Sequence, residues 1–129
     1  MPQSSINQLC DLVRETNFAI HVYHRNGHLE KIYENALCHR LRKLDVDVKQ
    51  QHPLPVFDED GTLLGEFFAD LLVDNRLVGE LKAVRVLVEG HIAQIVGYLK
   101  SSRIETGLLI NFGTSRLQIK KYLMSNPAT

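Results

Sequence analysis

Three charged side chains, Asp70, Glu80 and Lys82, lie within residues 65–88, a stretch that is otherwise rich in apolar residues. Carboxylates that face each other in apolar surroundings repel, because little water is present to screen them. Compensation must come from a bound cation, from the lysine or from a raised carboxyl pKa. A divalent metal ion held by both carboxylates meets this requirement most directly. The alternative is a set of charges on a solvated sheet face, since so short a pattern often arises by chance.

The elements that must position these side chains are the two strands of a hairpin. Residues 65–88 read as two apolar strands joined by a tight turn at residues 74–76. If the residues that flank this turn pair with each other, Asp70 lies directly opposite Glu80. Lys82 then shares the face of Glu80, because side chains alternate along a strand. Apolar residues fill most other positions, so we expect little of either face to be exposed. They are Phe67, Phe68, Leu71, Leu72, Val73, Leu77, Val78 and Leu81.

The apolar periodicity predicts two helices, three strands, a third helix and two further strands, in that order. This order is typical of an α/β fold with a mixed sheet, without the repeated alternation of a doubly wound domain. Two prolines in the first strand predict that it is interrupted or lies at an edge of the sheet. The helices are expected over residues 4–24, 28–43 and 91–103, and the strands over residues 46–57, 63–73, 77–88, 108–112 and 117–123.

The whole chain has the composition of one globular domain, with 44% apolar and 23% charged residues among 129. Its length suffices for a single core but not for two, so we expect one domain over residues 1–129. No apolar run reaches membrane-spanning length and residues 1–16 lack a signal pattern, which predicts a cytoplasmic protein without membrane contact. In that compartment Cys10 and Cys38 are expected to remain reduced thiols. The formal net charge of zero is not typical of a nucleic-acid-binding protein, although acids gather in residues 58–89 and bases follow them.

Asp70, followed after nine residues by Glu80-Leu81-Lys82, resembles the D…ExK motif of the PD-(D/E)xK nuclease superfamily. Together with three other blocks, the chain is similar to the small bacterial GxxExxxR family, which is assigned to that superfamily. The resemblance covers most of the chain and implies a restriction-endonuclease-like core, a mixed β-sheet flanked by helices. The four blocks are Gly27–Leu37, Phe67–Val84, His91–Lys100 and Gly107–Gly113.

The resemblance also implies roles for individual residues. Asp70 and Glu80 would hold magnesium or manganese, with the carbonyl of Leu81 as a further ligand. Lys82 would orient or help to deprotonate the attacking water and stabilise the phosphate. Glu30 matches the named glutamate of the GxxExxxR pattern and would complete the metal site. The alternative for Glu30 is a surface glutamate that pairs along its helix.

Residues of the third helix form a second group of candidates. Gln94 and Tyr98 resemble the QxxxY element of some superfamily exonucleases, in which these residues contact phosphate or the metal-bound water. His91 recurs on the same helical face, and Gln51 lies at the edge of the expected active face; both are weaker candidates. Packing between helix and sheet would explain the glutamine and the tyrosine equally well.

Two positions depart from the family pattern. Glu34 stands where the family has its motif arginine, one turn from Glu30, and His21 stands where relatives usually carry an acid. Three functions therefore remain open. The first is a metal-dependent nuclease that acts on DNA, and the second is a catalytically inactive nuclease-fold module that binds nucleic acid or protein and is compatible with a homodimer. The third is a purely structural subunit.

Three histidines, His21, His24 and His28, have the spacing of zinc ligands on one helical face. Residues 25–27 should break the helix that would align them, because they end in glycine. We therefore expect these histidines to lie on the surface.

Overall fold

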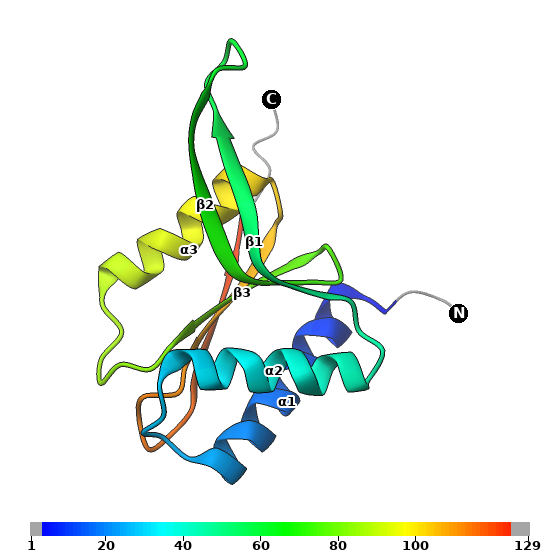
Figure 1. The fold of residues 1–129 in the computed structure, drawn as a ribbon, viewed down its shortest axis with the longest axis vertical. Helices are drawn as coiled ribbons and strands as arrows, with labels where there is room; N and C mark the ends of the chain where they lie inside the picture. The colour runs from blue at the N-terminus through cyan, green and yellow to red at the C-terminus, as the bar shows by residue number, and fades with distance from the viewer. Residues whose placement is uncertain (1–3, 125–129) are drawn as a thin grey trace.

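The computed structural model describes residues 4–124, and Figure 1 shows how their elements are arranged. The eight predicted elements follow one another in the predicted order, with ends that differ from the predictions by a few residues. They are α1 (Ile6–His24), α2 (Glu30–Lys43), β1 (Val48–Phe57), β2 (Leu63–Val73), β3 (Leu77–Lys82), α3 (Glu89–Ser102), β4 (Thr106–Asn111) and β5 (Gln118–Leu123).

The strands form one mixed sheet in the order β1-β2-β3-β4-β5. Three neighbouring pairs are antiparallel, whereas β3 and β4 are parallel and are connected through α3. The predicted α/β fold with a mixed sheet flanked by helices is therefore confirmed, and β1 lies at an edge as its prolines indicated. The third strand ends at Lys82, six residues earlier than predicted. The side-chain amide of Asn111 binds both the N–H and the carbonyl of Val84, and so occupies backbone groups that a longer strand would use.

Two apolar cores cover the two faces of the sheet. The helices α1 and α2 pack against one face and α3 packs against the other. Alternation along β3 produces this division: Leu77 and Leu81 belong to the core under α1 and α2, while Val78 points to the core under α3. Glu80 and Lys82 share the face of Val78, so the structure places them on the same side of the sheet as α3.

Tyr33 fixes the beginning of α2. Its ring is fully buried and stacks on Phe112 with 4.3 Å between ring centroids. Its hydroxyl accepts the N–H of His28 at 3.1 Å and donates to the carbonyl of Arg25. These contacts tie the connection before α2 to the sheet, and the helix begins two residues later than predicted. The next residue, Glu34, points towards β1, where Gln50 and Gln51 donate to its carboxylate.

The turn end of the β1–β2 hairpin projects from the rest of the molecule (Figure 1). Nearer the sheet, Leu54 is buried in the core under α3, and the ring centroid of Phe67 lies 5.2 Å from that of Tyr98. We call residues 54–68 the arm. Phe67 is 43% exposed and Phe68 52% exposed, so the prediction that little of these strands is exposed is wrong at both positions. The reason is that β3 pairs with β2 only from Leu71 to Val73. Beyond that point β2 has β1 as its one neighbouring strand among residues 4–124.

Candidate active site

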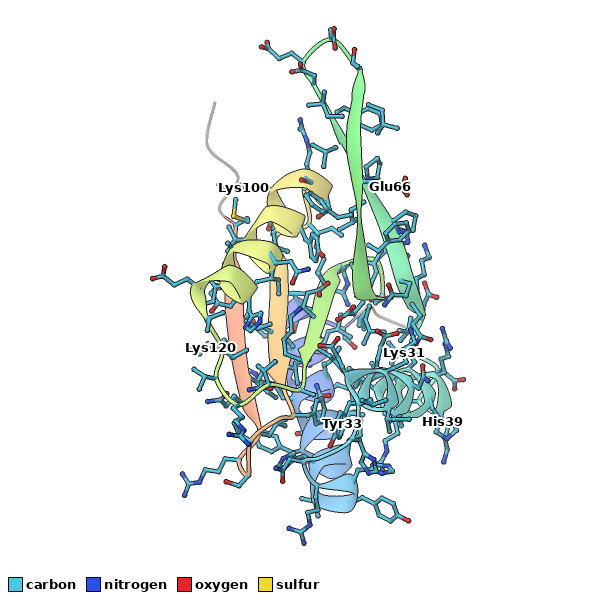
Figure 2. The ribbon with its side chains drawn as sticks, turned by 60° about the vertical axis from the view of Figure 1, so that its left-hand side comes forward. Lys31, Tyr33, His39, Glu66, Lys100 and Lys120 are labelled. Carbon is cyan, nitrogen blue, oxygen red and sulfur yellow. The ribbon has the colours of Figure 1, made fainter. Side chains whose placement is uncertain are left out.

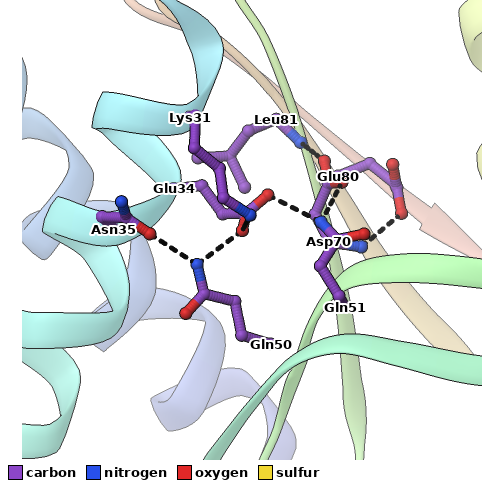
Figure 3. A network of polar contacts seen from close by, with 8 residues as sticks. All are labelled: Lys31, Glu34, Asn35, Gln50, Gln51, Asp70, Glu80 and Leu81. Carbon is purple, nitrogen blue, oxygen red and sulfur yellow. Dashed lines mark hydrogen bonds and ion pairs between the residues drawn. The ribbon is translucent and has the colours of Figure 1, made fainter.

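Asp70 and Glu80 face each other where β2 and β3 separate. The pairing of these strands ends at Leu71 and Gly79, adjacent to the two acids, so the predicted register is confirmed. There the carboxylates replace the ladder: Glu80 Oε1 accepts the N–H of Asp70 at 3.0 Å, and Asp70 Oδ2 accepts the N–H of Leu81 at 2.9 Å (Figure 3). Both acids are therefore held by backbone groups of the opposite strand, which fixes their positions without neutralising them.

The electrostatic state of the pair follows from its burial. Glu80 is 2% exposed. Burial, and then the negative charge of Asp70, raise the pKa of Glu80 to about 9. Burial also raises the pKa of Asp70, and the negative charge of Glu34 adds to this effect. At neutral pH one proton is therefore retained on Glu80 unless a cation takes its place.

A row of hydrogen bonds links Lys82 on β3 to α3. The Nζ of Lys82 donates to Oε1 of Gln94 at 2.9 Å, and Nε2 of Gln94 donates to the hydroxyl of Tyr98 at 2.7 Å. The pKa of Tyr98 is raised by burial and then by the negative charge of Glu80, so its hydroxyl remains protonated. The structure thus brings together the three predicted residues Lys82, Gln94 and Tyr98 on the side of the sheet that carries Glu80.

Glu34 is the residue that sequence reasoning missed. Its side chain is 3% exposed and lies at the centre of a polar network between α2 and β1 (Figure 3). The carboxylate accepts from Nζ of Lys31 at 2.7 Å, from Nε2 of Gln50 at 2.5 Å and from Nε2 of Gln51 at 2.9 Å. The sequence offered one indication, the acid at the motif arginine position, but nothing in it predicted partners on β1.

Gln51 connects this network to the acid pair. Its Nε2 also lies 3.3 Å from Oδ1 of Asp70, so one amide bridges Glu34 and Asp70. The backbone of Gln51 has φ 51°, in the left-handed region that non-glycine residues rarely adopt. Gln50 and His52, its neighbours on β1, pair with β2, whereas Gln51 does not. The local strain therefore turns this one side chain towards the site.

Among the predicted acidic ligands, Asp70 and Glu80 are the two whose carboxylates lie together. Among residues 4–124, no three aspartate, glutamate, histidine or cysteine side chains are grouped closely enough to hold a metal ion. Glu30 is exposed at the start of α2; partial burial, and then the negative charge of Asp70, raise its pKa. Asp70 and Glu80 nevertheless supply adjacent carboxyl oxygens, and a cation can replace the proton that Glu80 retains. Magnesium is commonly bound by one or two carboxylates and by water, so this donor set suits it.

The histidines have other roles. His91 Nδ1 accepts the N–H of Val88 at 3.1 Å and so caps the start of α3. His21 is buried, with Nε2 at 3.0 Å from the carbonyl oxygen of Thr114, so the prediction of a surface position is wrong for this residue. His24 is half-buried, and the predicted surface position is confirmed for His28, which is exposed.

A comparison with protein families identifies the superfamily of the chain. The model of the PD-(D/E)XK nuclease superfamily matches residues 7–122. The chain belongs to the PD-(D/E)XK nuclease superfamily. The restriction-endonuclease-like fold inferred from the D…ExK motif is thus supported by the superfamily match and by the observed sheet.

Comparison with solved structures gives the same fold. The crystal structure of SSO0001 is similar to this chain, with a TM-score of 0.58 and 17% sequence identity. The match covers 74% of the present chain and 50% of the SSO0001 chain. The present chain therefore spans about half the length of SSO0001. A comparison with curated proteins finds no match. Within residues 4–124, no helix has the length and apolar character needed to cross a membrane.

Proposed function

We propose that the chain is a metal-dependent nuclease that hydrolyses phosphodiester bonds of nucleic acid, with DNA as its substrate. The observation that carries the proposal is the buried Asp70–Glu80 pair with Lys82 on the same strand face as Glu80. Membership of a nuclease superfamily supports nuclease-like function and contact with nucleic acid. We also propose that the chain is of the GxxExxxR type, because Gly27 and Glu30 keep the spacing of that motif.

Asp70 and Glu80 would hold a magnesium or manganese ion, with the carbonyl of Leu81 and the carboxylate of Glu30 as further proposed ligands. When bound, such an ion stabilises the negative charge that develops on the phosphate. The pair selects a cation because its two carboxylates are too close and too buried to be ionised together without one.

Lys82 is the group that we assign to the attacking water and the phosphate. Its hydrogen bond to Gln94 holds the ammonium beside α3, on the sheet face that carries Glu80. Gln94 uses its amide hydrogen on the Tyr98 oxygen, so the hydroxyl hydrogen of Tyr98 remains able to donate to a phosphate oxygen. The three side chains would thus bind and orient the substrate beside the acids.

Glu34 and Gln51 are positioning residues in this proposal. Glu34 does not reach Asp70 itself but holds Gln51, whose amide contacts Asp70. The negative charge of Glu34 also raises the pKa of Asp70, so ionised Asp70 is stabilised more strongly when a cation is bound.

Cleavage of labelled DNA and RNA, single-stranded and double-stranded, with magnesium or manganese tests the proposal. Asp70→Asn and Lys82→Ala should each lower the DNA cleavage rate about a hundredfold or more while the circular dichroism spectrum is unchanged. Lys100→Ala, at an exposed position on α3, is the matched lysine control and should cleave normally. Cleavage that survives in purified Asp70→Asn, or that resists chelation of divalent ions, would refute the assignment of this site.

The second candidate is an inactive module that retains the fold and binds nucleic acid or protein. The observation that favours it is the acid Glu34 at the motif arginine position, which removes a positive charge from the site. A binding module predicts that Asp70→Asn leaves DNA retention unchanged. Retention should instead fall with salt and with neutralisation of the basic residues Arg116, Lys120 and Lys121.

A further inference from the structure

Exposed large apolar side chains are concentrated on two surfaces of the molecule. One surface is the arm, and the other is the outer side of α1 and α2 with the residues next to them. Eleven of the fourteen such residues among residues 4–124 lie on these two surfaces, so neither concentration is the ordinary scatter of a protein surface. On the arm they are Phe57, Leu63, Leu64, Phe67 and Phe68, and on the helices they are Phe18, Val22, Tyr23, Leu29, Ile32 and Leu44.

The helical surface contains a groove between α1 and α2, with a volume of about 810 Å³. Ile32 and Leu44 line it and are 44% and 54% exposed. The basic residues Arg40 and Lys43 line it on the α2 side, and Glu15 is its one acid. The groove therefore combines an apolar floor with a positively charged margin.

The arm has the complementary chemistry. Residues 54–68 contain four acids, Asp58, Glu59, Asp60 and Glu66, and no lysine or arginine. A polyanion such as DNA is repelled by this charge, so the arm is unsuited to grip the backbone of a nucleic acid. An apolar ribbon with an acidic margin fits a groove whose margin is basic.

The arm cannot reach the groove of its own chain. The arm projects from one end of the molecule, and α1 and α2 lie at the other end (Figure 1). Figure 2 shows the same separation, with Glu66 on the arm far from His39, which lines the groove on α2. The two surfaces can meet only between different molecules.

We propose that two copies of this chain associate through a two-fold axis, with the arm of each copy lying in the α1–α2 groove of the other. Two molecules that lie antiparallel bring each arm beside the groove of the partner, so both contacts form at once. Such an arrangement is closed, whereas a single head-to-tail contact would continue into a chain of molecules. The dimer covers the exposed apolar residues of the arm together with Ile32 and Leu44 in the groove, and it pairs the opposite charges of the two surfaces. It does not depend on the proposed nuclease activity.

Charge reversal on each surface tests the proposal, with mass measured by sedimentation velocity over a range of protein concentrations. Glu59 and Glu66 suit the arm, because Asp58 and Asp60 accept backbone N–H groups that support its turn. Glu59→Lys/Glu66→Lys should raise the dissociation constant of the dimer about tenfold or more, and the reversal of the groove, R40E/K43E, should do the same. A mixture of the two variants should restore the dimer, since the mixed pair has two complementary contacts.

Two neutral substitutions separate burial from charge. Leu64→Ser on the arm should weaken the dimer, whereas Val86→Ser, at a residue of similar exposure outside both surfaces, should not. A wild-type protein that stays monomeric at all concentrations would overturn the proposal, as would a dimer that no arm or groove variant weakens. Growth into larger assemblies would exclude the closed two-fold arrangement. Circular dichroism of each variant confirms that loss of the dimer is not loss of folding.

Discussion

Glu80→Gln should make the protein more stable above pH 5, although it alters a buried residue of the proposed site. Glutamine keeps an oxygen that can accept the N–H of Asp70, as Glu80 does at 3.0 Å. It also adds an N–H group that can donate to the Asp70 carboxylate. The variant therefore imitates the protonated state of Glu80 at every pH.

The expected size follows from the pKa of Glu80. An unperturbed glutamate has a pKa of 4.5, and in the folded protein the pKa of Glu80 is about 9. The folded state thus holds a proton that the unfolded state loses above pH 4.5, so this stabilisation is complete below pH 4.5 and is lost as pH rises towards 9. The slope is about 1.4 kcal/mol per pH unit, and the loss amounts to about 3 kcal/mol between pH 4.5 and pH 7.

Urea unfolding followed by circular dichroism, in a metal-free buffer at several pH values, measures this effect. The two proteins should have similar free energies of unfolding near pH 4.5, and the variant should be more stable by about 3 kcal/mol at pH 7. Glu105→Gln, at an exposed position, is the control and should follow the wild type. If wild type and Glu80→Gln show the same pH dependence, Glu80 does not retain the proton and the electrostatic argument for a cation site fails.

Three further results are expected. Gly113→Ala should destabilise the fold by several kcal/mol, since a Cβ would lie 2.3 Å from backbone atoms of Val84. Gly97→Ala in α3 has free space and should stabilise the fold by up to about 1 kcal/mol. Thermal unfolding compares the two variants, and equal melting temperatures would contradict the reasoning. Gln51→Ala should raise the metal concentration needed for half-maximal cleavage more than it lowers the maximal rate, because it removes the amide that contacts Asp70. An unchanged metal titration would remove Gln51 from the site. Cys38 should resist alkylation at pH 8 until the protein is unfolded, because it is buried and its pKa is raised to about 11. Rapid labelling of the native protein would contradict the burial of this side chain on α2.

The acid pair could be predicted from sequence because it depends on local geometry. A three-residue turn and the alternation of side chains fix which residues of a hairpin face each other, so Asp70 opposite Glu80 followed from the chain itself. The helical spacing of Gln94 and Tyr98 likewise placed them on one side of α3, where they bond to each other.

Glu34 and Gln51 could not be predicted in the same way. Their contact joins α2 to β1 across 17 residues of sequence, and it depends on how the helix lies on the sheet. It also needs a left-handed backbone at a glutamine, which no residue preference indicates. The exposure of Phe67 and Phe68 was missed for a related reason: periodicity identifies a strand but does not show where its neighbour ends.

The two edges of the sheet have a consequence for how the protein behaves at high concentration. On the outer strand β1, Pro53 and Pro55 lack the N–H groups that an added strand would need, and the outer strand β5 carries Lys120 and Lys121. Prolines and lysines at such positions oppose the edge-to-edge growth that leads to amyloid-like aggregates. Exposed apolar residues on the arm can therefore be kept for recognition without making the sheet itself a template for fibrils.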